Sequence, residues 1–323
     1  MKITVVVCAH AHERIPKTRL AISSVLGGSR TPDEVLLILD GDEALEHALR
    51  TELPAAVTSV PNAGRGISDA RNTALAAASG EVVAFIDDDA WVDDSWLATI
   101  ERAFLSSAVL GVGGRVVPDW EDPRVALPEE LYWIVGSTYK GHRTDRGPMT
   151  RPIGANMAAR RDALIAVGGF SAAFGPQGGV KVSSNEELAT FAALADAFGP
   201  NHVWYEPAAV AHHYAPAARC TFRYLVHRSA VEGRSKADVR TIYGARSMAH
   251  DRSYARSVII PGVAHHVARG VVHFDRRELG AGIRIAAAAA IAAGGYLARR
   301  SRALLRPAVP TAVSAISVAG GDA

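Results

Sequence analysis

The chain has 323 residues, of which 49% are hydrophobic, and its formal net charge is +2. This composition supports a substantial folded core, in one large domain or two modest ones, and excludes a wholly disordered chain. The nearly balanced charge gives no general attraction for nucleic acid, so we expect no nucleic-acid partner. Cys8 and Cys220 are too few for a disulfide framework, and the amino terminus lacks the pattern of a signal peptide. A cytoplasmic protein is therefore expected.

The amino-terminal third alternates between apolar runs typical of buried strands and segments with helical periodicity. This alternation predicts an α/β fold, with a mostly parallel twisted sheet flanked by helices. Ligands of such sheets bind at the carboxyl ends of the strands, so the residues after each strand are the first candidates for a site. Strands are expected at 3–8, 34–39, 56–60, 82–86, 109–117 and 203–207, with helices at 20–26, 42–53, 67–78 and 95–105.

Three consecutive carboxylates, Asp87, Asp88 and Asp89, follow the apolar run 82–86. Side chains alternate along a strand, so Asp87 and Asp89 can share one side while Asp88 points the other way. Mg²⁺ and Mn²⁺ prefer oxygen ligands and commonly take one or two carboxylates together with substrate phosphates. The triplet therefore indicates a cation site, and a solvated acidic loop that caps the next helix is the competing interpretation.

Several segments, in a fixed order, carry a resemblance to a known family. They are VVVCAHAHERIPKTRLAISSV, EVLLILDGD, NAGRGISDARNTALAAASGEVVAFIDDDA, GANMAARRDALIAVGGF and SNEELATF. Together they resemble the inverting family 2 glycosyltransferases of the GT-A fold, and the combination is far more specific than the aspartate triplet. The resemblance implies a catalytic domain at 1–240 that moves a sugar from a nucleoside diphosphate sugar to an acceptor hydroxyl with inversion. The acceptor could be a glycan, a lipid-linked saccharide or a small molecule, as in envelope glycan synthesis.

The resemblance also implies roles for single residues. Asp40 would contact the base or ribose of the donor, and Arg71 would lie along the same pocket. Asp87 and Asp88 would take part in binding the nucleotide sugar, with Asp87 on the ribose or as a second metal contact. Asp89, the last acid of the DXD-type motif, would bind Mn²⁺ or Mg²⁺ bridging the diphosphate. Such a cation stabilises the charge of the leaving group without proton transfer.

The general base is implied to lie in the segment SNEELATF. Glu187 occupies the position of the second acid of a two-acid motif, where the family usually has Asp, and Glu186 is the alternative base. Glutamate has one methylene more than aspartate, so the carboxyl group of Glu187 reaches further from the backbone than the usual base does. Judged without the resemblance, two acids after Ser183 or Ser184 are typical of a helix N-terminus, where the helix dipole favours negative charge.

The adjacent histidines His212 and His213 are further candidates for the same cation, because a neutral imidazole is a common metal ligand. Spacing to Arg219 in the family favours His213, and an exposed loop histidine without a metal is the competing interpretation for either. Three arginines are candidates for a contact with the diphosphate: Arg219, Arg223 and Arg228.

The carboxyl-terminal third carries no chemistry of the family. A helical, basic appendage is expected at 241–305, and a disordered tail at 306–323. Residues 279–298 form an Ala-rich run of nearly the length that crosses a bilayer, interrupted by Arg284. Three interpretations stay open: a helix packed on the catalytic domain, an interfacial helix held by anionic lipids, and a true span. The second predicts peripheral contact with the inner face of the plasma membrane.

Two other functions compete with a transferase. A sugar-phosphate nucleotidyltransferase also uses an α/β sheet with a carboxylate-bound metal, but it ordinarily has a Gly-rich basic loop after the first strand, and AHAHERIPK is not one. A non-catalytic GT-A-like binding protein would keep the fold, yet the presence of Asp40, Asp89 and Glu187 together argues against it. Aromatic residues between 120 and 139 either stack on a sugar or, in the favoured interpretation, fix a loop to the domain. The sequence predicts neither the donor sugar nor the oligomeric state.

Overall fold

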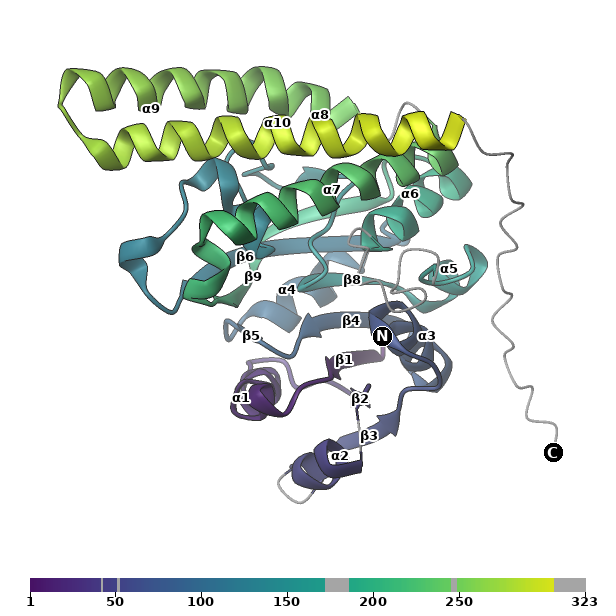
Figure 1. Ribbon diagram of the computed structural model, residues 1–323. Helices are drawn as coiled ribbons and strands as arrows, with labels where there is room; N and C mark the ends of the chain where they lie inside the picture. Colours follow the sequence, from purple (N-terminus) through teal and green to yellow (C-terminus); the bar gives the residue numbers. More distant parts are fainter. Residues whose placement is uncertain (42, 51–52, 172–185, 245–248, 305–323) are drawn as a thin grey trace, which may run out of the picture.

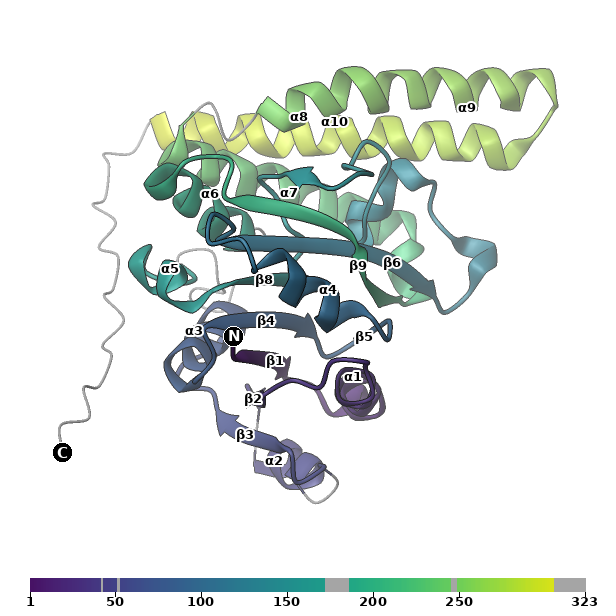
Figure 2. The ribbon, with the colours of Figure 1, turned by 180° about the vertical axis from the view of Figure 1, so that it is seen from behind.

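The computed structural model describes residues 1–41, 43–50, 53–171, 186–244 and 249–304. The tail expected at 306–323 and the helix cap expected at Ser183 or Ser184 lie outside the described residues. In the described part, one continuous sheet forms the centre of the molecule, with helices on both faces and a helical hairpin across one end (Figures 1 and 2).

The central sheet has nine strands in the order β3-β2-β1-β4-β8-β6-β9-β5, and β7 pairs with β9. The side that holds β3, β2, β1 and β4 is parallel, as the alternation of strands and helices predicted. Beyond β4 the sheet becomes mixed, because β8 runs antiparallel between β4 and β6. Parallel neighbours need a crossover connection, which is usually a helix. The antiparallel neighbours β6 and β8 need none, and loops, 3-10 turns and the short strand β7 join them. The strands are β1 Ile3–Ala9, β2 Glu34–Leu39, β3 Val57–Pro61, β4 Val82–Asp87, β5 Ala90–Val92, β6 Gly111–Trp120, β7 Gly147–Pro148, β8 Asn156–Arg160 and β9 Val203–Ala215.

Two apolar cores lie on the two faces of the sheet. Successive side chains of β1 alternate between them: Val5 and Val7 face one core and Val6 the other. Helices α1, α2 and α4 cover the first face, and α3, α5 and α6 the second. The helices are α1 Ile15–Leu26, α2 Glu43–Arg50, α3 Gly66–Ala77, α4 Trp96–Ala103, α5 Arg161–Ala166, α6 Glu186–Phe198, α7 Phe222–Tyr243, α8 Ala249–Tyr254, α9 Ile260–Val272 and α10 Arg276–Leu304, with a π-helical turn at Ala255–Ile259.

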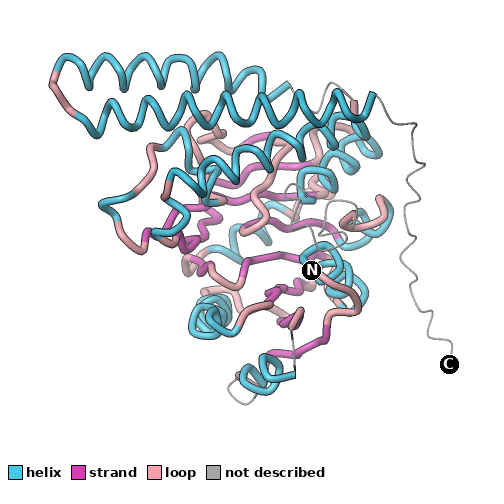
Figure 3. The backbone as a smooth tube through the Cα atoms, in the orientation of Figure 1, coloured by secondary structure: helices cyan, strands magenta, loops and turns pink. Residues whose placement is uncertain are grey.

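Strand β9 is longer than the sequence predicts. The expected strand 203–207 was ended by Pro207, but β9 continues to Ala215 as one strand (Figure 3). It pairs with β6 from Val203 to Glu206 and again from Val210 to Ala215. A register shift opposite Gly114 and Arg115 accommodates the proline, since a bulge tolerates a residue without an N–H. The prediction that the histidine pair follows a strand is therefore wrong, because both histidines lie inside it.

The carboxyl-terminal helices form a layer beyond the sheet (Figure 1). Helices α9 and α10 make an antiparallel hairpin, and the carboxyl-terminal half of α10 lies along α7. The two backbones approach closely at Gly233, where an added Cβ would lie 1.9 Å from the carbonyl oxygen of Ala292. Ile285 of α10 is fully buried in a cluster with Leu225 of α7. Helix α10 is therefore packed on the body of the protein from Ile285 onwards.

Candidate active site

The carboxyl ends of β1, β2 and β4 open into a cavity of about 390 Å³. This is the edge of the sheet where an α/β fold places its ligand. Because β1 lies between β2 and β4, the residues that end these three strands meet at one edge. Side chains from distant parts of the sequence line the cavity, among them Cys8, Asp40, Arg71, Asp87, Glu187 and His213.

Asp87, Asp89 and His213 form a group that could hold a metal ion, with one ligand atom of each within 4.8 Å of the others. Asp87 ends β4, and the short strand β5 then pairs with β9 so that Ala90 lies opposite His213. The Nε2 atom of His213 is 3.1 Å from Asp89 Oδ1 and 3.9 Å from Asp87 Oδ2. Two carboxylates and one imidazole form a donor set suited to Mn²⁺.

The other side of the His213 ring faces Gly136. Among the described residues, its Nδ1 atom has no hydrogen-bond partner. Gly136 adopts a left-handed conformation, with φ of 73°, and an added Cβ there would lie 3.1 Å from His213 Cε1. The absence of a side chain at Gly136 leaves the imidazole room in this position.

Arg14 also belongs to this site, although no motif or spacing singles it out within an expected polar loop. Its guanidinium donates to Asp88 Oδ1 at 2.6 Å and lies 3.1 Å from Asp89 Oδ2. Burial alone would raise the pKa of Asp89, but the hydrogen bond with His213 and the charge of Arg14 hold it below its usual value. Asp88 is buried, and this burial raises its pKa despite the neighbouring arginine. Asp88 is thus directed towards Arg14, while Asp87 and Asp89 face His213.

His212 lies away from the three candidate ligands. Its ring stacks on Trp91 at a centroid distance of 3.7 Å, and its Nε2 atom is 2.8 Å from Asp93 Oδ1. Adjacent residues of a strand point to opposite faces, so β9 can bring only one of the two histidines to the cavity. The structure brings His213 there and keeps His212 with Asp93.

The opposite part of the cavity is organised by Arg71, whose side chain is only 3% exposed. Its Nη1 atom donates to Glu186 at 2.8 Å, and its Nη2 atom lies 3.7 Å from Asp87 Oδ1. Asp40 accepts a hydrogen bond of 2.6 Å from the backbone N–H of Gly66, at the start of α3. Asp40 and Arg71 therefore line one pocket, as the resemblance implies.

The two glutamates that begin α6 have different surroundings. Glu186 is buried and paired with Arg71, whereas the half-buried Glu187 lines both this cavity and a second one beside it. Burial, together with the charge of Glu186, raises the pKa of Glu187 to about 8. A carboxylate with a pKa near neutrality is suited to proton transfer.

The three candidate arginines are not equivalent. Arg219 Nη2 lies 3.9 Å from Asp89 Oδ2, whereas Arg223 is exposed and Arg228 pairs with Glu232 at 3.0 Å. Among these three, Arg219 is the arginine beside the candidate metal ligands.

A mixed sheet with acidic residues at the end of its central parallel strands is the architecture of the GT-A fold. Residues 4–168 match the family model described as glycosyl transferase family 2. The chain belongs to this family and is a glycosyltransferase. Family membership does not favour the nucleotidyltransferase or the non-catalytic alternative.

The chain is 30% identical, over 248 residues, to the glucosyl-dolichyl phosphate glucuronosyltransferase of Haloferax volcanii; the match covers 75% of this chain and 79% of the relative. It is 27% identical to the succinoglycan biosynthesis protein ExoM of Rhizobium meliloti, over 71% of this chain and 72% of the relative. The solved structure of a mannosyltransferase from Pyrobaculum calidifontis, in complex with GDP-Man and Mn²⁺, is similar with a TM-score of 0.60. That likeness covers 92% of this chain and 87% of the other at 19% identity, and it shows the fold.

Proposed function

We propose that the protein transfers a glycosyl group from a nucleoside diphosphate sugar to an acceptor hydroxyl with inversion, in a reaction that requires Mn²⁺ or Mg²⁺. The observation that carries the proposal is one cavity lined both by candidate metal ligands, Asp87 and His213, and by the high-pKa carboxyl Glu187. Asp40 and Arg71 line the same cavity and would hold the nucleotide.

Asp87, Asp89 and His213 would hold the cation, which supplies charge stabilisation to the departing diphosphate. Glu187, in its ionised form, accepts the proton of the acceptor hydroxyl. The hydroxyl oxygen forms the new bond to the anomeric carbon, and the bond from that carbon to the diphosphate breaks. The nucleoside diphosphate leaves with the electron pair. A single displacement of this kind inverts the anomeric configuration.

The proposal is tested by hydrolysis of a panel of sugar nucleotides, including UDP-glucose, UDP-glucuronate and GDP-mannose, with and without Mn²⁺. We expect at least one donor to be cleaved with Mn²⁺ and not with EDTA, and Asp89→Ala to lose this cleavage. Asp94→Ala is the matched control, because Asp94 is an exposed acid of the same region. Cleavage that Asp89→Ala retains at the wild-type rate would overturn the assignment of the metal site.

We further propose that the tip of the α9–α10 hairpin attaches the protein to an anionic membrane, at the cytoplasmic face of the plasma membrane. Figures 1 and 2 show the tip extending past the edge of the sheet. Val271, Val272 and Phe274 at this tip are 60%, 69% and 92% exposed. Phe274 also adopts a left-handed backbone, with φ of 52°, a conformation that costs about 1–2 kcal/mol for a residue other than glycine.

Three arginines and two acids lie beside these apolar side chains. Arg269, Arg276 and Arg277 are exposed, Asp275 is exposed as well, and Glu278 lies 3.4 Å from Arg269, so the tip carries an excess of one positive charge. Basic residues next to inserted apolar groups favour anionic lipid surfaces. Helix α10 is, by length and composition, long and apolar enough to cross a membrane. Because its carboxyl-terminal half packs on α7, we favour peripheral attachment by the tip over a span. The relative from Haloferax volcanii is named for a dolichyl phosphate substrate, which supports work at a membrane.

Flotation with liposomes tests the attachment. We expect the wild type to float with vesicles of phosphatidylcholine and phosphatidylglycerol, and Phe274→Asp to remain in the soluble fraction. Leu105→Asp is the control, since Leu105 is a 77% exposed apolar residue in another part of the molecule. Equal flotation of wild type and Phe274→Asp would contradict attachment through the tip.

A further inference from the structure

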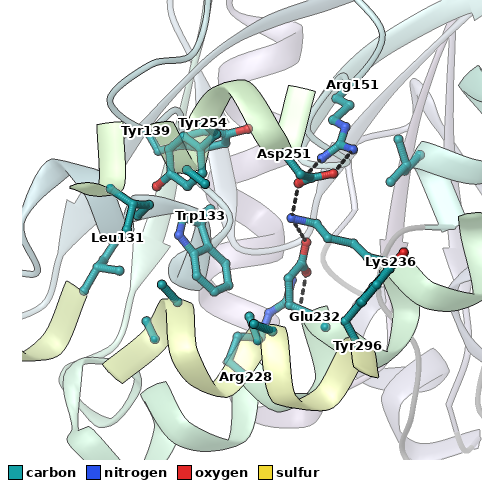
Figure 4. Close-up of a pocket in the computed structure, with 18 of the residues that line it drawn as sticks. Leu131, Trp133, Tyr139, Arg151, Arg228, Glu232, Lys236, Asp251, Tyr254 and Tyr296 are labelled. Atoms are coloured by element: carbon teal, nitrogen blue, oxygen red, sulfur yellow. Dashed lines mark hydrogen bonds and ion pairs between the residues drawn. The ribbon is translucent and has the colours of Figure 1, made fainter. Parts of the chain in front are cut away.

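A second cavity, of about 440 Å³, lies between the catalytic domain and the helices α7, α8 and α10 (Figure 4). It meets the first cavity at Gly136, Ile153 and Glu187, which line both. The carboxyl group assigned as the base therefore stands at the boundary between the donor site and a second chamber. An acceptor hydroxyl must approach this carboxyl group from outside the donor site.

One wall of the second cavity is apolar. Helix α10 contributes four alanines on consecutive turns of one face: Ala288, Ala289, Ala292 and Ala293. Aromatic rings come from the catalytic domain and α8, and Figure 4 shows Trp133, Tyr139 and Tyr254 grouped on one side of the cavity. The small alanine side chains leave room along the helix, and an apolar group there would be removed from water.

A chain of charged side chains crosses the same cavity (Figure 4). Arg228 is 3.0 Å from Glu232, Lys236 lies 3.1 Å from Glu232 and 2.7 Å from Asp251, and Asp251 accepts from Arg151 at 2.9 Å. Burial would raise the pKa of Glu232, but Lys236 and Arg228 lower it to about 2, so the carboxylate stays charged. With Arg240, Arg252 and Glu187, which also line the cavity, five cations face three carboxyl groups. The excess positive charge favours a ligand that carries an anionic group.

The buried hydroxyl of Ser137 adds a polar group to the second cavity. Ser137 lines the cavity and is fully buried, and its Oγ atom has no hydrogen-bond partner within the described part of the chain. An unsatisfied buried hydroxyl destabilises the cavity, because it has lost its hydrogen bonds to water without a replacement. A ligand hydroxyl placed there would supply the missing partner. Arg240, which donates to the hydroxyl of Tyr296, lines the same chamber.

We infer that this second cavity binds the acceptor, and that the acceptor is a saccharide joined through a phosphate to an apolar chain. The inference rests on the proposed function, because it places the reacting hydroxyl of the saccharide at Glu187. The alanine face of α10 and the aromatic rings accommodate the apolar chain and the sugar faces. The excess of the five cations over the three carboxyl groups accommodates the phosphate.

Binding of three compounds to the full chain tests this acceptor class by calorimetry. Decyl glucosyl phosphate has both the phosphate and the chain, decyl glucoside has only the chain, and glucose 1-phosphate has only the phosphate. We expect decyl glucosyl phosphate to bind at least about tenfold more tightly than either of the others, because each lacks one interaction worth about 1.4 kcal/mol or more. Equal binding of glucose 1-phosphate would identify a site for a free sugar phosphate and overturn the inference.

A matched pair of substitutions in α10 locates the bound compound. Ala289 lines the cavity, whereas its neighbour Ala290 is exposed on the outside of the helix. We expect Ala289→Phe to fill the chamber and weaken binding of decyl glucosyl phosphate at least about tenfold, and Ala290→Phe to bind as the wild type does. Circular dichroism of both variants checks folding, and the smaller replacement Ala289→Val gives a second, intermediate loss. Binding unaffected by Ala289→Phe would overturn the inference.

Hydrolysis of sugar nucleotides by the wild type is measured beside these titrations. Absent hydrolysis with intact binding of decyl glucosyl phosphate would remove the proposed transferase reaction and leave the ligand site. Hydrolysis without any binding of decyl glucosyl phosphate would overturn the acceptor site and leave the transferase reaction in place. The two failures are therefore distinguishable.

Discussion

Replacement of Glu187 by glutamine gives the sharpest prediction about the chemistry. The substitution keeps the size of the side chain and removes the carboxylate that accepts the proton of the acceptor. We expect transfer to fall by about 10²- to 10⁴-fold, the usual contribution of a general base. Binding of the nucleotide sugar should persist, because Asp40 and Arg71 lie on the donor side and keep their contacts.

The pH dependence of the wild type follows from the pKa of about 8 for Glu187. About one tenth of this carboxyl group is ionised at pH 7 and about nine tenths at pH 9, so transfer should rise about tenfold over this interval. The assay is the initial rate of transfer at saturating donor and Mn²⁺ between pH 6 and 9. Glu187→Gln should show a flat profile. A wild-type-like rise that survives in Glu187→Gln would refute the assignment and move the base to Glu186.

The same pKa also predicts how stability varies with pH. The pKa of Glu187 is higher in the folded protein than its ordinary value of 4.5, so the folded state holds this proton more tightly. Its contribution to the free energy of unfolding is complete below pH 4.5 and is lost as the pH rises through about 8. Urea unfolding at pH 5 and pH 8.5 should therefore show a smaller loss of stability for Glu187→Gln than for the wild type.

Three further predictions concern single positions. Gly233→Ala should destabilise the protein by about 1–3 kcal/mol in urea unfolding, because its Cβ would meet the carbonyl oxygen of Ala292. The control Gly294→Ala meets nothing within 4 Å and should stabilise α10 by about 0.5–1 kcal/mol; a loss at Gly294 as large as at Gly233 would contradict the close approach. In calorimetry, His213→Ala should weaken Mn²⁺ binding at least about tenfold, and His212→Ala should leave it unchanged. A larger loss for His212→Ala than for His213→Ala would contradict the assignment of His213 as a metal ligand. Gly136→Ala should weaken Mn²⁺ binding and lower stability by about 1–2 kcal/mol, since φ there is 73°; wild-type affinity would remove its role in placing the imidazole.

The parts of the structure that local sequence determines were predictable. Apolar runs rich in Val, Leu and Ile predicted β1, β2 and β4, because burial on both faces of the sheet leaves continuous apolar runs. The position of Asp87 and Asp89 at one strand end follows from the same pattern. Pro207 misled the prediction for β9, since a bulge that tolerates proline depends on pairing with β6, which is distant in the sequence.

The features that sequence reasoning missed depend on contacts between distant segments. Arg14 reaches Asp88 across 74 positions, and Arg151 reaches Asp251 across 100. No periodicity signals such pairs. Spacing to Arg219 in the family favours His213, but the residues by themselves do not choose between His212 and His213, because the choice depends on which face of β9 lies towards the cavity. Once β9 is known to continue through both residues, strand alternation decides it.

The most direct measurement of the central claim is a crystal structure of the protein with Mn²⁺ and a nucleoside diphosphate, with the metal located by its anomalous scattering. Our account predicts one peak in contact with Asp89, bridging to the diphosphate, with His213 and Asp87 beside it and the nucleoside near Asp40. A nucleoside diphosphate bound in this cavity without a metal at Asp89, or a metal bound elsewhere, would contradict the account.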